Sequence, residues 1–167
     1  MAISAPVKSV QYVNYSTKPV IFNQGYDWNS KLRLSFAKLT FTAAGFTSAA
    51  AGDIQLIRMP AGKIRVWRNL CLVICPVGTA TSDLDIGIGA YTKTDRTTQT
   101  LSGAALAGSL DVGGAALSQN FITGSDALVA IVEVESMDGW DLVCSFDTAN
   151  SPAAGDMYVG IVYQMAN

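Results

Sequence analysis

The alternation of apolar and polar residues over residues 63–75 constrains the fold of this chain more than any other feature. The apolar positions of one parity are Ile64, Val66, Leu70, Leu72 and Ile74. A period of two residues is that of a β-strand with one buried face, so the run predicts a central strand. Arg68 falls on the apolar parity. Because an unpaired buried charge is costly, we expect a bulge, bend or loop edge at residues 68–69 and not a buried charge.

Four other segments are typical of β-strands. Apolar residues alternate strictly with other residues over residues 84–91, where the outer face is rich in glycine and has few side chains. Residues 157–165 form a last regular strand. Residues 31–42 alternate with a slip at 37–38, which predicts a bulge or two short strands. Residues 53–59 are a further strand candidate. Residues 92–120 have no clean period and predict a long loop with one helical turn or short strand, and Phe121 and Ile122 begin another short strand.

Residues 128–146 are interpreted as a β-hairpin. A three-residue loop at 137–139, with Gly139 in the left-handed conformation, places Val134 opposite Leu142. The same register sets Glu135 opposite Asp141 on the outer face, where like charges repel. This pair is a candidate site for a cation or for a basic side chain of a neighbour; two solvated carboxylates are the commoner alternative.

Regular turn signals, seven or eight strands and no amphipathic helix predict an all-β fold. We expect an antiparallel β-sandwich of jelly-roll or Greek-key kind, formed by one domain over residues 31–167. Residues 1–30 lack periodicity and predict an extended N-terminal arm whose aromatic side chains contact a partner surface. The alternative is that they cover the chain's own core or add an edge strand. The aromatic candidates for this interface are Tyr12, Tyr15, Phe22, Tyr26 and Trp28.

The composition excludes several classes of function. Charged residues are 14% of the chain, against about a quarter in typical soluble proteins, which suggests that weakly polar surface is covered by another subunit. A net charge of -2 argues against a nucleic-acid partner. The densest basic group is Lys63, Arg65 and Arg68, which on an alternating strand is a solvated face or an interface contact. The interface candidates are Lys63, Arg65 and Trp67, which share one parity.

Nucleophilic and metal chemistry have little basis in this sequence. The chain has no histidine, which excludes Ser-His and Cys-His arrangements. Cys71 and Cys75 are about 13 Å apart along a strand, too far for a disulfide, and with Cys144 they match no zinc spacing. Asp83 and Asp85 are interpreted as a polar outer face. We therefore expect no catalytic residue, no metal, no cofactor and no enzymatic activity.

No apolar run approaches the length of a membrane span, and the N-terminal residues lack the pattern of an export signal. We therefore expect a protein without a membrane partner that is made in the cytoplasm. Three cysteines without a disulfide framework agree with a reducing compartment.

Several motifs resemble those of small structural proteins of tailed bacteriophages. They are the run Met-Pro-Ala-Gly-Lys-Ile-Arg-Val at 59–66, Gly-Thr-Ala at 78–80, Leu-Asp-Ile-Gly-Ile-Gly-Ala-Tyr-Thr at 84–92, Leu-Asp-Val at 110–112 and Val-Gly-Ile-Val-Tyr at 159–163. The resemblance covers residue 54 to the C-terminus. It departs at Asp95 and Arg96, where such proteins often have a turn glycine.

Proteins of this kind are commonly head decoration or cement proteins, often trimeric β-sandwiches on the capsid exterior. The resemblance therefore implies a virion protein on the capsid surface, made in the host bacterial cytoplasm, whose partners are its own copies in a homotrimer and the major capsid protein. It implies no catalytic residues. A tail-associated structural protein is an alternative within the same resemblance.

A carbohydrate-binding or host-adhesion module is the alternative from another class, because β-sandwiches often bind sugars through exposed aromatic side chains. Trp28, Trp67 and Trp140 could supply them. Trp140 falls on the buried parity and is predicted to lie in the core. Cementing of a shell explains more of the features together.

Overall fold

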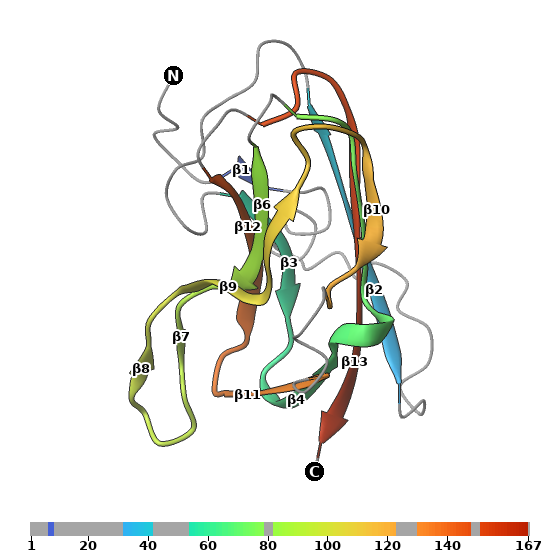
Figure 1. Cartoon of the computed structure of the whole chain (residues 1–167). Coiled ribbons are helices and arrows are strands. Elements are labelled where there is room, and N and C mark those ends of the chain that lie inside the picture. Colours follow the sequence, from blue (N-terminus) through green and yellow to red (C-terminus); the bar gives the residue numbers. More distant parts are fainter. Residues whose placement is uncertain are drawn as a thin grey trace.

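The computed structural model describes residues 7–8, 32–41, 54–78, 82–122, 130–147 and 151–166. Two sheets pack face to face, as Figure 1 shows with β6 and β12 in one layer and β2 and β13 in the other. This confirms the all-β sandwich. In the described part of the chain every strand pairing is antiparallel except that of β1 with β3.

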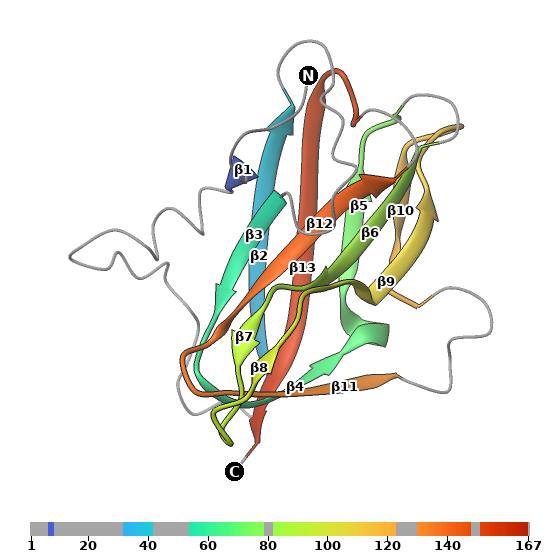
Figure 2. The same ribbon diagram turned by 90° about the vertical axis from the view of Figure 1, so that its left-hand side faces the viewer.

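Sheet I has five strands, and its order across the sheet is β1 (Val7–Lys8), β3 (Ile54–Met59), β12 (Trp140–Asp147), β6 (Asp83–Ile88) and β9 (Ser102–Asp111). Sheet II has six strands: β10 (Leu117–Asn120), β5 (Leu72–Cys75), β13 (Gly155–Ala166), β4 (Gly62–Trp67), β11 (Ile131–Ser136) and β2 (Arg33–Phe41), which pairs with β13. A small ribbon of β7 (Tyr91–Thr92) and β8 (Thr98–Gln99) projects from the body on the left of Figure 1 and lies in front of the body in Figure 2.

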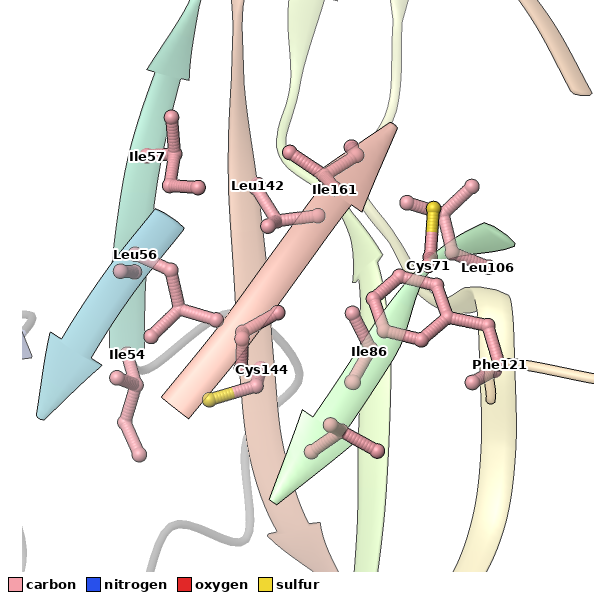
Figure 3. Close-up of a cluster of buried hydrophobic side chains, with 14 of the residues drawn as sticks. Ile54, Leu56, Ile57, Cys71, Ile86, Leu106, Phe121, Leu142, Cys144 and Ile161 are labelled. Atoms are coloured by element: carbon pink, nitrogen blue, oxygen red, sulfur yellow. The ribbon is translucent and has the colours of Figure 1, made fainter. Parts of the chain in front are cut away.

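The core lies between the two sheets and is built from the inward parity of each strand. Figure 3 shows Leu142, Cys144 and Ile86 of sheet I meeting Ile161 of β13 in sheet II. Trp140 is fully buried, as its parity predicts. This arrangement follows from burial of one apolar face per sheet.

The predicted hairpin over residues 128–146 is wrong, because β11 and β12 belong to different sheets. Val134 lies opposite Ile64 of β4 and not opposite Leu142. Gly139 does take a positive φ of 84°, but it turns the chain from one sheet into the other. Both strands point their apolar parity at the same core, so the pattern of alternation is the same for a hairpin and for a corner.

The predicted strand over residues 63–75 is divided by a short 3-10 helix, η1 (Arg68–Leu70). A bend was expected here, but Arg68 is buried, with 6% of its surface exposed, which corrects the expectation for its charge. Its Nε donates a hydrogen bond to the Leu106 carbonyl of β9 at 2.6 Å. The helix also shifts the alternation, so that Cys71 and Val73 face the core and Leu72 faces outward.

Strand β2 is continuous, and neither the predicted bulge nor two short strands are present. Its register with β13 runs without a shift from Arg33 opposite Tyr163 to Phe41 opposite Gly155. The slip in the sequence pattern has a different cause. The apolar residues of the first half, such as Leu34, point to the outside of sheet II, and those of the second half point to the core.

The predicted loop over residues 92–120 contains β9, a strand of ten residues. Its pairing with β6 is interrupted by two register shifts, and Ser109 has a positive φ of 52°. The Ser109 amide donates to Asp85 Oδ1 at 2.7 Å, which gives this outer-face carboxylate a structural role. These irregularities removed the period that would have predicted the strand. Phe121 and Ile122 follow β10 and do not begin a strand.

Gly87 of β6 lies where β9 bulges across it. A Cβ at this position would overlap the backbone carbonyls of Ser102 and Gly103. We expect Gly87→Ala to lower the free energy of unfolding by about 2–3 kcal/mol in urea denaturation, because overpacking against backbone cannot relax by a rotamer change. Gly114→Ala is the matched control, since its Cβ would meet nothing within 4 Å. Equal stabilities of the two variants would contradict this account.

The predicted N-terminal arm lies outside the described residues, apart from Val7 and Lys8. These two form β1, which runs parallel to β3 opposite Ile54 and Gln55. The aromatic candidates of residues 1–30 also lie outside the described part, so the arm stays a prediction. None of the described residues forms a helix with the length and hydropathy of a membrane span.

Candidate interaction surface

The outer side of sheet II carries a set of exposed apolar side chains, which we name the apolar face. It comprises Leu34 (52% exposed) and Phe36 (54%) of β2, Leu72 (37%) and Ile74 (39%) of β5, and Tyr158 (42%) of β13, with the partly exposed Val162. Large exposed apolar groups in contiguous positions usually mark an interaction site. The apolar face is therefore the main candidate for binding.

The strand registers bring these side chains together in rows across three neighbouring strands. Leu34 lies opposite Val162, and Tyr158 lies opposite Ile74. Between these rows, Gly160 lies opposite both Phe36 and Leu72. Side chains directly opposite on one face of a sheet are about 4.5–5.5 Å apart at Cβ, so the rows form one continuous surface.

Phe36 is held against the sheet by the absence of a side chain at Gly160. A Cβ there would lie 2.8 Å from Cε1 of the Phe36 ring, so the ring occupies the space above this glycine. The same contact explains why Gly160 is buried although it is on the outer side of the sheet. Phe36 is thus an exposed aromatic ring in a fixed position.

The charges at the border of the apolar face are paired within the chain. Lys38 Nζ lies 2.9 Å from Asp156 Oδ2 and 5.7 Å from the centre of the Tyr158 ring. Thr40 Oγ1 donates a hydrogen bond to Asp156 at 2.6 Å. The hydrogen bonds from Thr40 and then Lys38 lower the pKa of Asp156 below its usual value. The border is therefore neutral near pH 7.

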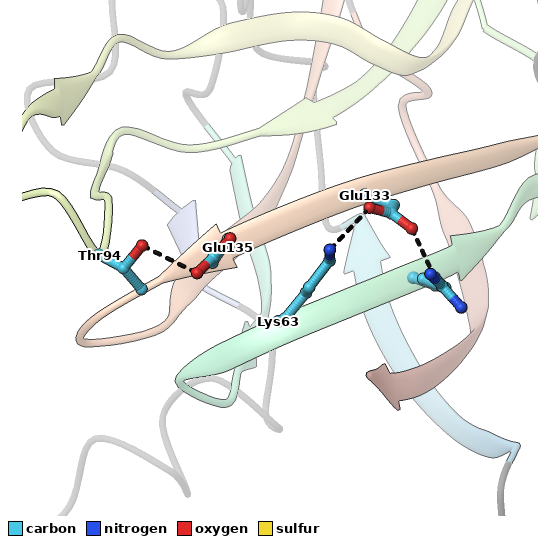
Figure 4. A network of polar contacts seen from close by, with 5 residues as sticks. Lys63, Thr94, Glu133 and Glu135 are labelled. Atoms are coloured by element: carbon cyan, nitrogen blue, oxygen red, sulfur yellow. Dashed lines mark hydrogen bonds and ion pairs between the residues drawn. The ribbon is translucent and has the colours of Figure 1, made fainter. Parts of the chain in front are cut away.

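Lys63, Arg65 and Trp67, the predicted interface residues of β4, lie on the outer side of the same sheet. Glu133 of β11 pairs with both basic side chains, and Figure 4 shows its contact with Lys63. Lys63 Nζ lies 3.2 Å from Glu133 Oε2, and Arg65 Nε lies 2.5 Å from Oε1. The hydrogen bonds from Arg65 and then Lys63 lower the pKa of Glu133. Trp67 is partly exposed. An interface role for these three residues stays a prediction.

Glu135 and Asp141 are not brought together, since their strands are in different sheets. Glu135 lies opposite Lys63 and accepts a hydrogen bond from Thr94 at 2.9 Å. Asp141 lies opposite Arg58 and pairs with it at 3.0 Å. The predicted register of the two carboxylates is wrong, and the described residues hold no cluster of three or more side chains suited to a metal ion.

An open polar groove lies between the β7–β8 ribbon and the end of sheet II. Charges of both signs line it, and the Thr94 contact with Glu135 connects the ribbon to β11 (Figure 4). The lining residues are Lys63, Tyr91, Lys93, Thr94, Asp95, Gln99, Glu133 and Glu135. Tyr91 is the one aromatic residue among them, so the groove has no pair of rings that could hold a sugar between them.

The three cysteines are fully buried and free. Burial raises the pKa of the Cys71 thiol to about 11 and that of Cys75 to about 12. Burial also raises the pKa of Cys144 well above its usual value. Because the thiolate is the reactive form, these groups are packing elements and not nucleophiles near neutral pH.

Sequence reasoning missed the apolar face, although the signal was present. The slip at residues 37–38 was interpreted as an irregular strand with one buried side, and the even-numbered apolar positions of residues 63–75 were interpreted as one buried face. In the structure, the apolar residues of β2 change at this slip from the outer to the inner side of sheet II. In β5, Leu72 and Ile74 point outward, because η1 reverses the parity. The slip at residues 37–38, on a strand that pairs with β13, was thus the signal of an exposed apolar surface.

Fold and surface together define a two-layer antiparallel β-sandwich with a neutral apolar outer face. No family model matches the sequence, and no curated protein matches it at a significant level. A chain of the capsid of Ralstonia phage GP4 superposes with a TM-score of 0.57 at 17% identity, over 98% of this chain and 99% of that chain. At this identity the likeness shows a shared fold.

Two further solved structures are similar at a greater distance. A chain of the cyanophage Pam1 capsid asymmetric unit has a TM-score of 0.43 at 16% identity, over 87% of this chain and 92% of that chain. A chain of the acidic stable capsid of Helicobacter pylori bacteriophage KHP30 has a TM-score of 0.34 at 16% identity, over 83% of this chain and 90% of that chain. Neither likeness is strong enough to support an argument.

Proposed function

We propose that this chain is a structural protein of a bacteriophage virion, and that it binds the exterior of the head as a decoration or cement protein. The observation that carries the proposal is the superposition with a chain of the Ralstonia phage GP4 capsid over almost the whole of both chains. The motifs at residues 59–66 and 84–92, which resemble small phage structural proteins, support the same function. The apolar face supplies a surface suited to permanent contacts.

The mechanism follows from linkage between binding and assembly. A protein that binds the assembled shell, and not its separated subunits, stabilises the shell by mass action. Copies that also contact one another add their binding energies through multivalency. The proposed partners are the major capsid protein and further copies of this chain, with the homotrimer that the resemblance implies as the proposed oligomer. Buried thiols and paired surface charges fit a rigid binding protein.

Purified protein should sediment with empty phage heads and reach a fixed number of copies per head. Deletion of residues 1–30 is expected to weaken this binding at least tenfold, because the aromatic side chains of the proposed arm would be lost. The body should remain folded, since the described part of this segment, Val7–Lys8, is an edge strand of sheet I. Circular dichroism and thermal unfolding of the deletion variant provide the control. Full decoration by the variant would remove the arm from the mechanism.

Purified tails in the same sedimentation assay distinguish the two locations in the particle. Binding to heads alone agrees with the proposal, whereas binding to tails alone would replace it with the tail-associated role. A chain that sediments with neither would have no place in the particle.

Carbohydrate binding has less support. Trp140 is fully buried and packs in the core, so it cannot stack on a sugar. Trp67 is partly exposed, but it lies on β4 of sheet II beside the ion-paired Arg65. Trp28 lies outside the described residues. A glycan array tests this alternative directly.

A further inference from the structure

We infer that the apolar face is a contact between two copies of this chain, related by a two-fold axis. Copies within the proposed homotrimer are related by a three-fold axis, so this contact joins copies of two different trimers. The inference deepens the proposed function, and it rests on that function for its place in a particle. Its physical basis is separate: the size, rigidity and charge of one surface. It is therefore testable on purified protein, without any shell present.

The apolar face has the size that a stable contact between copies requires. Its five most exposed side chains leave on the order of 450 Å² open, at about 200 Å² for a large side chain. Two copies would thus bury about 900 Å² of apolar surface. Because the cores of such interfaces are about 65% apolar, the total would be about 1,400 Å², within the range of stable protein interfaces.

The position of this surface is specific to one side of the molecule. Every large apolar side chain that is exposed within a described strand belongs to sheet II: Leu34, Phe36, Leu72, Ile74, Ile131 and Tyr158. No such side chain is exposed on the described strands of sheet I. An apolar side of one sheet can pack on that of a second sheet at about 10 Å, the spacing inside β-sandwiches.

The face is already arranged for binding. Phe36 lies over Gly160 and the other side chains stand on hydrogen-bonded strands, so few side chains have to be ordered when a partner binds. Rigid aromatic residues near the middle of an interface commonly contribute most of the binding energy. Phe36 and Tyr158 have this position and character.

The charges favour a copy of the same chain over a strongly charged partner. Among the described residues of β2 and β13, the border of the face carries one cation and one anion, Lys38 and Asp156, which neutralise each other. It therefore has no net charge that would attract a basic or an acidic surface. A two-fold contact places the same patch on both sides, so an apolar centre meets an apolar centre of equal size. Each border then presents a cation and an anion to its equivalent.

Light scattering tests the contact through the mass in solution. Phe36→Glu is expected to halve the mass of the wild-type particle at the same concentration and to weaken association at least tenfold, because a carboxylate would be buried in the contact. Met137→Glu is the matched control: Met137 is 50% exposed and lies outside the face. Leu72→Ser is a second variant with a smaller change, and circular dichroism checks that each variant is folded.

Cysteine cross-linking locates the contact. The native thiols are buried, so a cysteine introduced by Leu34→Cys is the reactive thiol, and a short bismaleimide should join two copies. Met137→Cys should give no covalent dimer under the same conditions. Cross-linking of Leu34→Cys should fall on dilution and disappear when Phe36→Glu is added.

Three results would overturn the inference: a wild-type protein that is a monomer at high concentration, equal masses of the Phe36→Glu and Met137→Glu variants, or equal cross-linking at positions 34 and 137. The sedimentation assay with phage heads does not depend on any of these results, so it tests the proposed function separately. A Phe36→Glu variant that loses head binding but keeps the wild-type mass would show that the face binds the shell. That outcome would overturn the inference and support the proposed function.

Discussion

Raising the pH from 8 to 10 is expected to lower the free energy of unfolding by about 2 kcal/mol for each of Cys71 and Cys75, or about 4 kcal/mol for the two, with a further loss from Cys144. The cause is the difference between the folded and unfolded chains. In the unfolded chain a thiol ionises with a pKa of about 8.5. In the folded protein, burial raises the pKa to about 11 for Cys71, about 12 for Cys75, and well above the usual value for Cys144.

The sign follows from counting protons. Below pH 8.5 the thiols are protonated in both states, so their contribution to stability is fully present. Above that pH the unfolded chain releases protons that the folded chain retains, and stability falls until the folded pKa values are reached. The loss should have a slope of about 1.4 kcal/mol per pH unit for each thiol.

Urea denaturation at pH 8, 9 and 10 measures this loss. Cys75→Ala is the matched variant. It lowers the free energy of unfolding at every pH because it leaves a small cavity. Its free energy of unfolding should, however, fall less steeply with pH than that of the wild type, because one thiol no longer contributes. Comparison with the wild type removes the contribution of lysine and tyrosine side chains, which both proteins share. Equal slopes would mean that Cys75 ionises equally well in the folded protein.

Trp140→Ala is expected to lower the free energy of unfolding by about 3–5 kcal/mol. Trp140 is the largest fully buried side chain of the described residues and begins β12, the strand between β3 and β6 in sheet I. Its removal takes apolar contacts from the core and leaves a cavity that the surrounding strands cannot close. The denaturation midpoint in guanidinium chloride measures the effect.

Trp67→Ala is the control for this substitution. Trp67 is partly exposed on the outer side of β4, so its loss should cost clearly less than that of Trp140. Trp140→Leu should fall between the wild type and Trp140→Ala, because it keeps part of the apolar volume. Similar costs for Trp67→Ala and Trp140→Ala would contradict the placement of Trp140 in the core.

Strand alternation predicted the elements that are regular and buried on one side. In β13 the predicted parity of Met157, Val159 and Ile161 is the buried one, and in β6 the same holds for Leu84, Ile86 and Ile88. The turn at Gly139 was also predicted correctly, because Gly139 has the left-handed conformation that the loop requires. These are local properties, because the direction of a side chain depends on the strand that carries it.

The prediction failed where a residue's environment depends on distant strands. Arg68 looked too polar for the interior, but η1 places its Nε at the Leu106 carbonyl of β9, a residue far along the chain. The irregular β9 has no period of its own, and its shape follows the bulges against β6. Neither contact leaves a signal in the residues next to it.

The candidate surface shows the same division. The low charge of the whole chain indicated an interface. The strand pattern proposed Lys63 and Arg65 for it, but both side chains are paired with Glu133. The apolar face was hidden because exposed and buried apolar residues look alike in a strand pattern. Only the pairing of β2 and β5 with β13 brings Phe36 and Leu72 to the same outer surface.

By itself, then, the sequence determined the β class, the position of most strands and the shortage of reactive groups, since alternation, glycine turns and residue content act within a few positions along the chain. The tertiary structure decided which sheet each strand joins, which side of sheet II faces solvent, and therefore where a partner can bind. The physical reason is that both sheets bury the same kind of apolar side against one core. Only long-range hydrogen bonding distinguishes a hairpin from a corner, and an inner side from an outer one.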